Sequence, residues 1–363
     1  LHSLRRRQRQ MCIRDRYKVQ EELGEDWNKT TLYGAFENLL DEIKDDERFR
    51  PDLVFYIGGH IVSKKLKSYL RSLKGVEQIR ISQEADIEDT FMHLTKVMDL
   101  PNSDAMSWLD NFGWHNHWED YRKLWMDALA KSYERKENFK PEFSSLATVK
   151  EFFSQLQKVE PQDFKAFTLG GKDAHDDGIY DRKFDTFLPG MMSSVFSGNS
   201  SAIRLMNLYA DRHVYCNRGV NGIEGSLSTA VGFSMCKNKS DKHVYCVLGD
   251  LSFFYDQNAL WNRNLNGKLR IIVLNNGGGA IFGKFQGLKE SQAREEMVMA
   301  KHHATAEGIC SQNDVKYLAA HTMEEMEQGI SQLIHAESER PMLLEVFTDM
   351  DVDNEMLEAI QKC

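Results

Sequence analysis

Apolar runs typical of buried strands alternate with helical segments across the second half of the chain, and this alternation restricts the fold most. The clearest runs are HVYCVLGD (243–250) and LRIIVLNN (269–276), and SFFYDQNALWNRN (252–264) between them fits a helix. PMLLEVFTD (341–349) predicts another strand. Continuous apolar strands joined by helices are typical of parallel sheets covered on both faces. We therefore predict an α/β fold with a doubly wound parallel sheet.

Two further strand–turn–helix segments precede these runs. FSGNSSAIRLMNLY (196–209) predicts a strand end, a turn at 198–200 and a helix. VYCNRGVNGIEGSLSTAVGFSMC (214–236) predicts a strand, a glycine-rich loop and a helix. In the order of the chain, these segments extend the same sheet.

The first half of the chain predicts a smaller unit of the same class. A helix is expected over 30–43, a strand over 53–57 that ends at Gly58-Gly59, a helix over 60–73 and a short strand over 79–81, which together form a βαβ unit. Residues 87–160 read as mostly helical and 161–190 as loop. We predict a boundary near residue 160, with a Rossmann-like domain over 17–160 and a second doubly wound domain over 161–363.

Composition excludes several classes of protein. The chain has 363 residues, enough for two domains at roughly 100–200 residues each. A net charge of -9 without basic blocks disfavours nucleic acid as a partner. The longest apolar runs fall short of the roughly 20 residues that span a bilayer. The six cysteines show no paired spacing, so we expect a reducing cytoplasmic location.

Residues 1–16 differ from the rest of the chain. They carry six arginines and no apolar helical face. A targeting peptide is one interpretation, but the segment has no apolar core for secretion. We favour non-native sequence joined upstream of a truncated product.

The residues most suited to chemistry end two neighbouring predicted strands. Asp250 ends one strand and Asn276 the next, with a single helix between them. Parallel strands present their carboxyl ends at one edge of the sheet, where ligands bind. Magnesium prefers oxygen ligands and is usually held by one or two protein groups and substrate phosphates. Gly249 would let a phosphate approach, the amides of Leu251 and Ser252 begin a helix that favours an anion, and the glycines at 277–279 could turn a carbonyl to the metal.

Each of these signals alone occurs in many α/β proteins, whereas their ordered set is specific. The set matches the thiamine-diphosphate motif of the pyruvate-decarboxylase-like superfamily, with Leu251 where many members have glycine. Segments 198–204, 217–232, 249–261 and 274–282 together resemble the 2-succinyl-5-enolpyruvyl-6-hydroxy-3-cyclohexene-1-carboxylate synthase family of menaquinone biosynthesis.

This resemblance implies a thiamine-diphosphate- and Mg²⁺-dependent transferase, with Mn²⁺ as a possible substitute. 2-Oxoglutarate would lose CO₂, and the remaining carbon unit would add to isochorismate. Residues 161–363 would form the diphosphate-binding domain, and the active site would lie at a subunit interface of a homodimer or a dimer of dimers.

The resemblance also implies roles for individual residues. The metal ligands would be Asp250, Asn276 and the Gly278 carbonyl. Ile281 would be the apolar wedge that keeps the cofactor bent, and Phe282 would line the substrate pocket. Asn199, Ser200 and Gly219 would contact the cofactor, together with Gly249, Leu251 and Ser252.

Arginines suit substrates with two carboxylates each, since guanidinium groups bind carboxylates through two hydrogen bonds. Arg204 and Arg218 match arginines that the family uses near its substrates, with Ser200 beside them. Lys64 and Lys65, after the Gly58-Gly59 turn, resemble a basic pair that reaches the family's active site. A solvated surface charge is the alternative for all four cations.

Family members carry a further N-terminal domain, whose glutamate hydrogen-bonds the pyrimidine ring of the cofactor. No part of residues 1–363 reads as that domain, so we expect this polypeptide alone to have no synthase activity. The alternatives are another thiamine-diphosphate carboligase or decarboxylase, or a non-catalytic dimerising remnant. We reject a calcium loop at 173–178, because Phe184 stands where the closing glutamate belongs, and metal roles for the histidine pairs 115/117 and 302/303.

Overall fold

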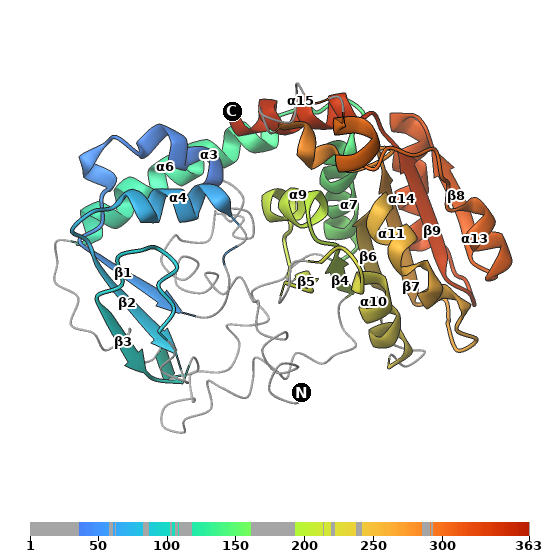
Figure 1. Ribbon diagram of the computed structural model, residues 1–363, viewed down its shortest axis with the longest axis horizontal. Coiled ribbons are helices and arrows are strands. Elements are labelled where there is room, and N and C mark those ends of the chain that lie inside the picture. The colour runs from blue at the N-terminus through green and yellow to red at the C-terminus, as the bar shows by residue number, and fades with distance from the viewer. Residues whose placement is uncertain are drawn as a thin grey trace. The chain divides into compact units, whose positions relative to one another are not determined.

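The computed structural model (Figure 1) describes residues 36–57, 61, 63–82, 87–101, 104–105, 108, 118–160, 193–212, 214–218, 222–236, 242–284, 291 and 293–362. The chain forms two compact units, one made of Leu1–Phe139 with Ile360–Cys363 and the other of Lys140–Ala359. Among the described residues, no helix combines the length and the apolar character needed to cross a membrane.

The first unit contains a parallel three-stranded sheet in the order β1-β2-β3. Its core joins α3 (Phe36–Ile43) and α4 (Lys64–Ser72) to α6 (Trp118–Asn138) through buried aliphatic and aromatic side chains. Ser63 caps α4 by accepting a hydrogen bond from the Leu66 amide at 3.0 Å. The strands are β1 (Leu53–Ile57), β2 (Glu77–Ser82) and β3 (Lys96–Asp99), and a 3₁₀ turn, η2, covers Glu47–Phe49.

The strand β3 corrects the prediction that residues 87–160 are mostly helical. The strand has only four residues, two half-buried and two exposed. An edge strand this short has no period that distinguishes it from a helix.

The second unit contains the predicted doubly wound sheet. All its strands are parallel, in the order β5-β4-β6-β7-β9-β8. The chain adds β5 on one side of β4 and then places β6 on the other side. The position between β4 and β6, where the order of strands reverses, is the kind of switch point at which α/β sheets bind ligands. The strands are β4 (Ser194–Ser197), β5 (Val214–Cys216), β6 (Val244–Gly249), β7 (Leu269–Asn275), β8 (Lys316–Ala320) and β9 (Met342–Phe347).

Helices cover both faces of this sheet, which explains why β6 and β7 are apolar at almost every position. On one face Cys246 and Ile271 pack with Phe253 and Leu227, and on the other the Tyr245 ring contacts Phe152 at 5.1 Å between centroids. The elements are α7 (Ser145–Val159), α9 (Ser201–Tyr209), α10 (Ser226–Met235), α11 (Asp250–Asp256), η4 (Gln257–Trp261), η5 (Ala280–Lys284), the π-helical turn η6 (Arg294–Val298), α13 (Glu307–Gln312), α14 (Met323–His335) and α15 (Met350–Lys362).

The helix α7 belongs to the second unit, so the division of the chain lies at Phe139–Lys140 and not near residue 160. Phe152 and Leu156 are each 1% exposed, and α7 packs against α9 and α14. The apolar period of a helix shows that one face is buried, but it does not show which sheet that face covers.

Candidate metal and diphosphate site

Asp250 and Asn276 lie at one edge of the six-stranded sheet, as the sequence predicts. The strands β6 and β7 pair in parallel, with Gly249 opposite Leu274. Asp250 is the first residue of α11, directly after β6, and Asn276 follows β7. The carboxyl ends of the two strands therefore bring a carboxylate and a carboxamide together, and the glycines at 277–279 continue the same edge.

The Asp250 carboxylate is almost fully buried and is held by backbone amides. Its side chain is 4% exposed. Oδ1 accepts a hydrogen bond from the Leu251 amide at 2.6 Å, and Oδ2 accepts one from the Gly278 amide at 2.9 Å. The second bond links the two strand ends directly.

Asn276 presents one satisfied and one unsatisfied end of its carboxamide. Nδ2 donates to Asp353 Oδ2 at 2.8 Å. Oδ1 is buried and accepts no hydrogen bond among the described residues. Buried polar atoms without a partner are rare in proteins, and an absent ion is one established explanation.

The glycine turn packs tightly against residues 299–302. Gly278 has φ of +148°, and a Cβ there would lie 2.6 Å from the Met299 carbonyl oxygen, so no side chain fits. The Gly279 amide donates to the same oxygen at 2.6 Å. The Gly278 carbonyl accepts from the Ala280 amide at 3.1 Å, and its second lone pair is the one that could face a metal.

These residues fit a magnesium ion and a diphosphate. A carboxylate and an amide oxygen with no other partner are ligands that Mg²⁺ accepts, and phosphates usually complete its shell. A Cβ at Gly249 would meet nothing within 4 Å, and φ is -74°, so the fold itself does not require glycine there. Close approach of a ligand to this backbone is the remaining physical reason for a glycine.

The turn after β4 and the loop after β5 form a second cluster beside this edge. Asn199 Nδ2 donates to the carbonyl oxygens of Asn217 and Gly222, and Asn199 Oδ1 accepts from Arg218 Nη1 at 3.0 Å. Asn199 therefore holds the loop, and its contact with a cofactor stays a prediction. Ser200 has φ of +67°, a strained conformation for a residue with a side chain, at the start of α9.

Two arginines follow in this cluster. Arg218 is half-buried, and its Nε atom is buried without a hydrogen-bond partner among the described residues. Arg204 is half-buried on α9, one turn after Ser200. The pKa of the Cys216 thiol between these elements is raised to about 11 by burial, and Arg218 partly offsets this effect.

The other predicted contacts lie on α11 and η5. Ser252 is buried and Leu251 half-buried on α11, while Ile281 is half-buried and Phe282 is 37% exposed on η5. Gly219, the Gly58-Gly59 turn, the rejected calcium loop and the histidines at 115 and 117 lie outside the described residues.

The predicted basic pair lies in the first turn of α4 in the first unit. Lys65 Nζ forms an ion pair with Asp41 Oδ2 at 2.6 Å. Lys64 is exposed and precedes it in the same turn. A substrate contact for this pair stays a prediction.

Two residues that were not predicted to belong to the site contact it. His302, interpreted from sequence as a structural or surface residue, places Nε2 3.3 Å from Asp250 Oδ2, and this contact with the carboxylate raises the pKa of His302. Asp353 accepts the hydrogen bond from Asn276. Neither has a local signal, because only the fold brings 302 and 353 to this edge.

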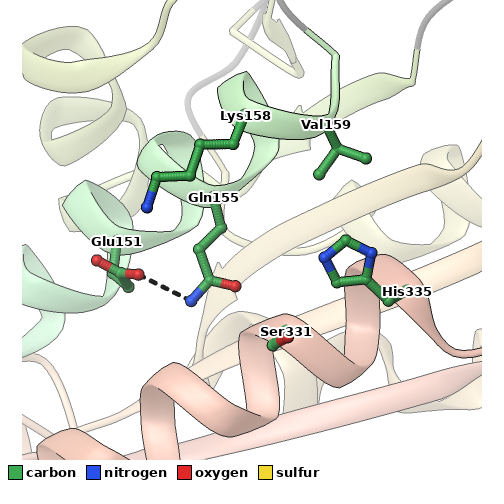
Figure 2. Close-up of a pocket in the computed structure, with 6 residues that line it drawn as sticks. All are labelled: Glu151, Gln155, Lys158, Val159, Ser331 and His335. Carbon is green, nitrogen blue, oxygen red and sulfur yellow. Dashed lines mark hydrogen bonds between the residues drawn. The ribbon is translucent and has the colours of Figure 1, made fainter.

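A shallow hollow in the second unit lies away from the site. Figure 2 shows it between α7 and α14, where Gln155 donates to Glu151 Oε1 at 2.8 Å. Its lining contains none of the site residues: Glu151, Gln155, Lys158, Val159, Ser331 and His335.

Comparison with known proteins agrees with this geometry. Residues 197–346 match the family described as thiamine pyrophosphate enzyme, C-terminal TPP binding domain, so this part of the chain is of the class of thiamine-pyrophosphate-binding domains. Proteins named 2-succinyl-5-enolpyruvyl-6-hydroxy-3-cyclohexene-1-carboxylate synthase are similar over most of the chain. The relative from Phocaeicola vulgatus is 32% identical over 86% of this chain and 49% of its own length. The relative from Christiangramia forsetii is 33% identical over 90% of this chain and 51% of its own length.

Over the part that it covers, the chain is similar to members of this synthase family. It spans about half the length of the curated relatives that it matches.

Proposed function

We propose that this chain supplies the metal- and diphosphate-binding half of an active site that joins 2-oxoglutarate to isochorismate with release of CO₂. The product would be 2-succinyl-5-enolpyruvyl-6-hydroxy-3-cyclohexene-1-carboxylate, the compound in the names of the relatives. The observation that carries the proposal is that the buried Asp250 carboxylate and Asn276 Oδ1, which has no partner among the described residues, follow adjacent parallel strands at the same edge of the sheet.

The protein residues would bind and orient the cofactor. Asp250, Asn276 and the Gly278 carbonyl would hold Mg²⁺, or Mn²⁺ in its place, against the diphosphate. Gly249 and the amides of Leu251 and Ser252 would approach the phosphates. Thiamine diphosphate, when bound, supplies the carbanion chemistry that decarboxylation requires.

The cluster at 199–218 would bind the carboxylates of the substrates. Arg218 is held at one nitrogen by Asn199, and its buried Nε lacks a partner among the described residues, so one edge of the guanidinium suits a carboxylate. Ser200 is the N-cap residue of α9, which follows β4, and Arg204 lies one turn further along this helix. Ile281 and Phe282 would supply the apolar wall, and Lys64 and Lys65 further positive charge.

The test uses the full-length gene product with thiamine diphosphate and Mg²⁺. With isochorismate present, we expect a carboligation product by mass spectrometry from 2-oxoglutarate and none from pyruvate. Arg218→Lys keeps the positive charge but loses the planar pair of donors. The KM for 2-oxoglutarate should therefore rise more than kcat falls. Preference for pyruvate would indicate another carboligase, and absence of turnover with metal-dependent cofactor binding would indicate a non-catalytic module.

The proposal also covers the assembly and the isolated chain. We propose a cytoplasmic homodimer or dimer of dimers, with the active site at the subunit interface. We expect the 363-residue chain alone to release no CO₂ from 2-oxoglutarate. Release above a control without protein would contradict this expectation.

A further inference from the structure

Asp353, on the first turn of α15, joins three elements behind the clamp formed by Asp250 and Asn276. Its Oδ1 accepts from the Ser145 amide at 2.7 Å, at the start of α7. Its Oδ2 accepts from Ser145 Oγ at 2.6 Å and from Thr348 Oγ1 at 3.1 Å, after β9. The same Oδ2 accepts from Asn276 Nδ2 at 2.8 Å. These four hydrogen bonds to the carboxylate therefore come from three residues, at the start of α7, after β9 and after β7.

A carboxylate that only accepts determines which way an adjacent carboxamide points. An ionised aspartate has no proton to donate, so only the NH₂ end of Asn276 can face it. The oxygen of Asn276 must then point away from Asp353, and this is the atom that is buried without a partner among the described residues. With a donor in place of Asp353 Oδ2, the amide would turn over and present NH₂ where a metal requires oxygen.

We propose that Asp353 is a positioning residue for the metal, which fixes the Asn276 carboxamide with its oxygen toward the ion. This inference rests on the proposed metal and diphosphate site. Asp353 does not contact the metal in this arrangement. Its effect is exerted through Asn276 alone, so it should alter metal affinity without altering which metal or which cofactor binds.

Exchanging the two side chains separates positioning from mere packing. In Asp353→Asn, the new Nδ2 at the position of Oδ2 would face Asn276 Nδ2, and relief of this donor–donor contact turns the Asn276 amide. In the double variant Asn276→Asp with Asp353→Asn, the new amide at 353 donates to the new carboxylate at 276. Ser145 Oγ and Thr348 Oγ1 can accept as well as donate, so the exchanged pair leaves the local hydrogen bonds satisfied.

Asp256 provides a matched control. It is a buried carboxylate that accepts from the Ser228 amide at 2.8 Å and from Ser228 Oγ, in the first turn of α10. Asp353 caps α7 through Ser145 in the same way. Asp256→Asn therefore reproduces the loss of a helix-capping carboxylate without removing a hydrogen bond to Asn276.

The experiment is a titration of the full chain with Mn²⁺ in the presence of thiamine diphosphate, in which free Mn²⁺ is followed by electron paramagnetic resonance. Substitution of a residue that hydrogen-bonds a metal ligand typically weakens metal binding by roughly 10- to 100-fold. We expect Asp353→Asn to weaken Mn²⁺ binding within this range, the exchanged double variant to restore most of it, and Asp256→Asn to leave it unchanged. Thermal unfolding without metal reports whether each variant is folded.

The outcomes distinguish the two proposals. If the unaltered chain binds no Mn²⁺ with thiamine diphosphate, the proposed site itself is wrong. If the unaltered chain binds and Asp250→Ala does not, but Asp353→Asn binds as tightly as the unaltered chain, the positioning role is overturned while the site stands. The positioning role is also overturned if Asp353→Asn weakens Mn²⁺ binding and the exchanged double variant does not restore it. In that case the loss is structural, because exchanging the pair does not reverse it.

Discussion

The two sides of the clamp are built in different ways. On the β6 side, Asp250 is held by the amide of the next residue and by one amide across the strand ends. On the β7 side, Asn276 is held by Asp353, which in turn depends on Ser145 and Thr348. Among the described residues, the hydrogen bonds to Asp250 thus come from backbone amides, with the His302 ring beside them, whereas the Asn276 carboxamide is oriented by side chains distant in sequence. Substitutions outside the clamp should therefore disturb the β7 side more readily than the β6 side.

The largest effect is expected from removing the charged ligand. Asp250→Ala deletes the only carboxylate among the proposed ligands and the acceptor of the Gly278 amide. Mn²⁺ affinity with thiamine diphosphate should fall by more than the roughly 10- to 100-fold typical of an outer residue. Calorimetric titration measures the loss. Equal losses for Asp250→Ala and Asp353→Asn would contradict the distinction between ligand and positioning residue.

The second effect concerns the backbone of the β7 side. Gly278→Ala places a methyl group 2.6 Å from the Met299 carbonyl oxygen at φ of +148°. Backbone strain of this kind costs about 1–3 kcal/mol, and the clash adds to it. The free energy of unfolding, measured by urea denaturation without ligand, should fall by at least this amount. An unchanged midpoint would show that this turn is not fixed by packing.

The sequence predicts the sheet and the two residues of the clamp far better than the residues that contact them from distant parts of the chain. The runs at β6 and β7 are buried on both faces, so their continuous apolar character identified the strands and placed Asp250 and Asn276 together. Asp353, by contrast, lies 77 positions from Asn276. In the segment 349–353 nothing local distinguishes it from Asp349 or Asp351, and only the packing of α15 and α7 does so.

Short or half-exposed strands were not predicted from the sequence, because they lack the continuous apolar run of a strand that is buried on both faces. The strand β8 has one buried residue in five, and β3 has none in four. His302 gave no signal because its contact with Asp250 depends on how residues 299–302 fold over the glycines. The strained Ser200 backbone is likewise a product of the turn between β4 and α9, not of the residue type.

A third prediction contrasts a glycine on the β6 side with Gly278. Gly249→Ala meets no atom within 4 Å at φ of -74°, so the fold should tolerate it. A compatible Gly→Ala change stabilises by about 0.4–1 kcal/mol. The rise in melting temperature on adding Mn²⁺ and thiamine diphosphate should nevertheless shrink, because the methyl group obstructs the phosphates. Unaltered stabilisation by the ligands would mean that they do not approach this backbone.

The smallest effect is expected at the opposite end of β6. Burial lowers the pKa of His243, just before this strand, from 6.5 to about 4. Between these values the unfolded chain binds a proton that the folded chain does not, so stability falls as the pH drops from 6.5 toward 4. His243→Gln should flatten this part of the dependence of unfolding free energy on pH. If the unaltered protein and His243→Gln lose stability equally between pH 6.5 and 4, the lowered pKa of His243 is contradicted. Asp250 variants, changed at the other end of β6, serve as the comparison for this pH dependence.

The central claim is that Asp250 and Asn276 share one metal ion with a diphosphate. Crystals grown with Mn²⁺ and thiamine diphosphate test it by anomalous scattering at the manganese edge. We predict one peak at about 2.0–2.2 Å from an Asp250 oxygen and from Asn276 Oδ1, the range of metal–oxygen distances for small divalent ions, with diphosphate oxygens beside it. A peak bound by His302 without Asn276, or diphosphate bound with no metal at this edge, would contradict the account.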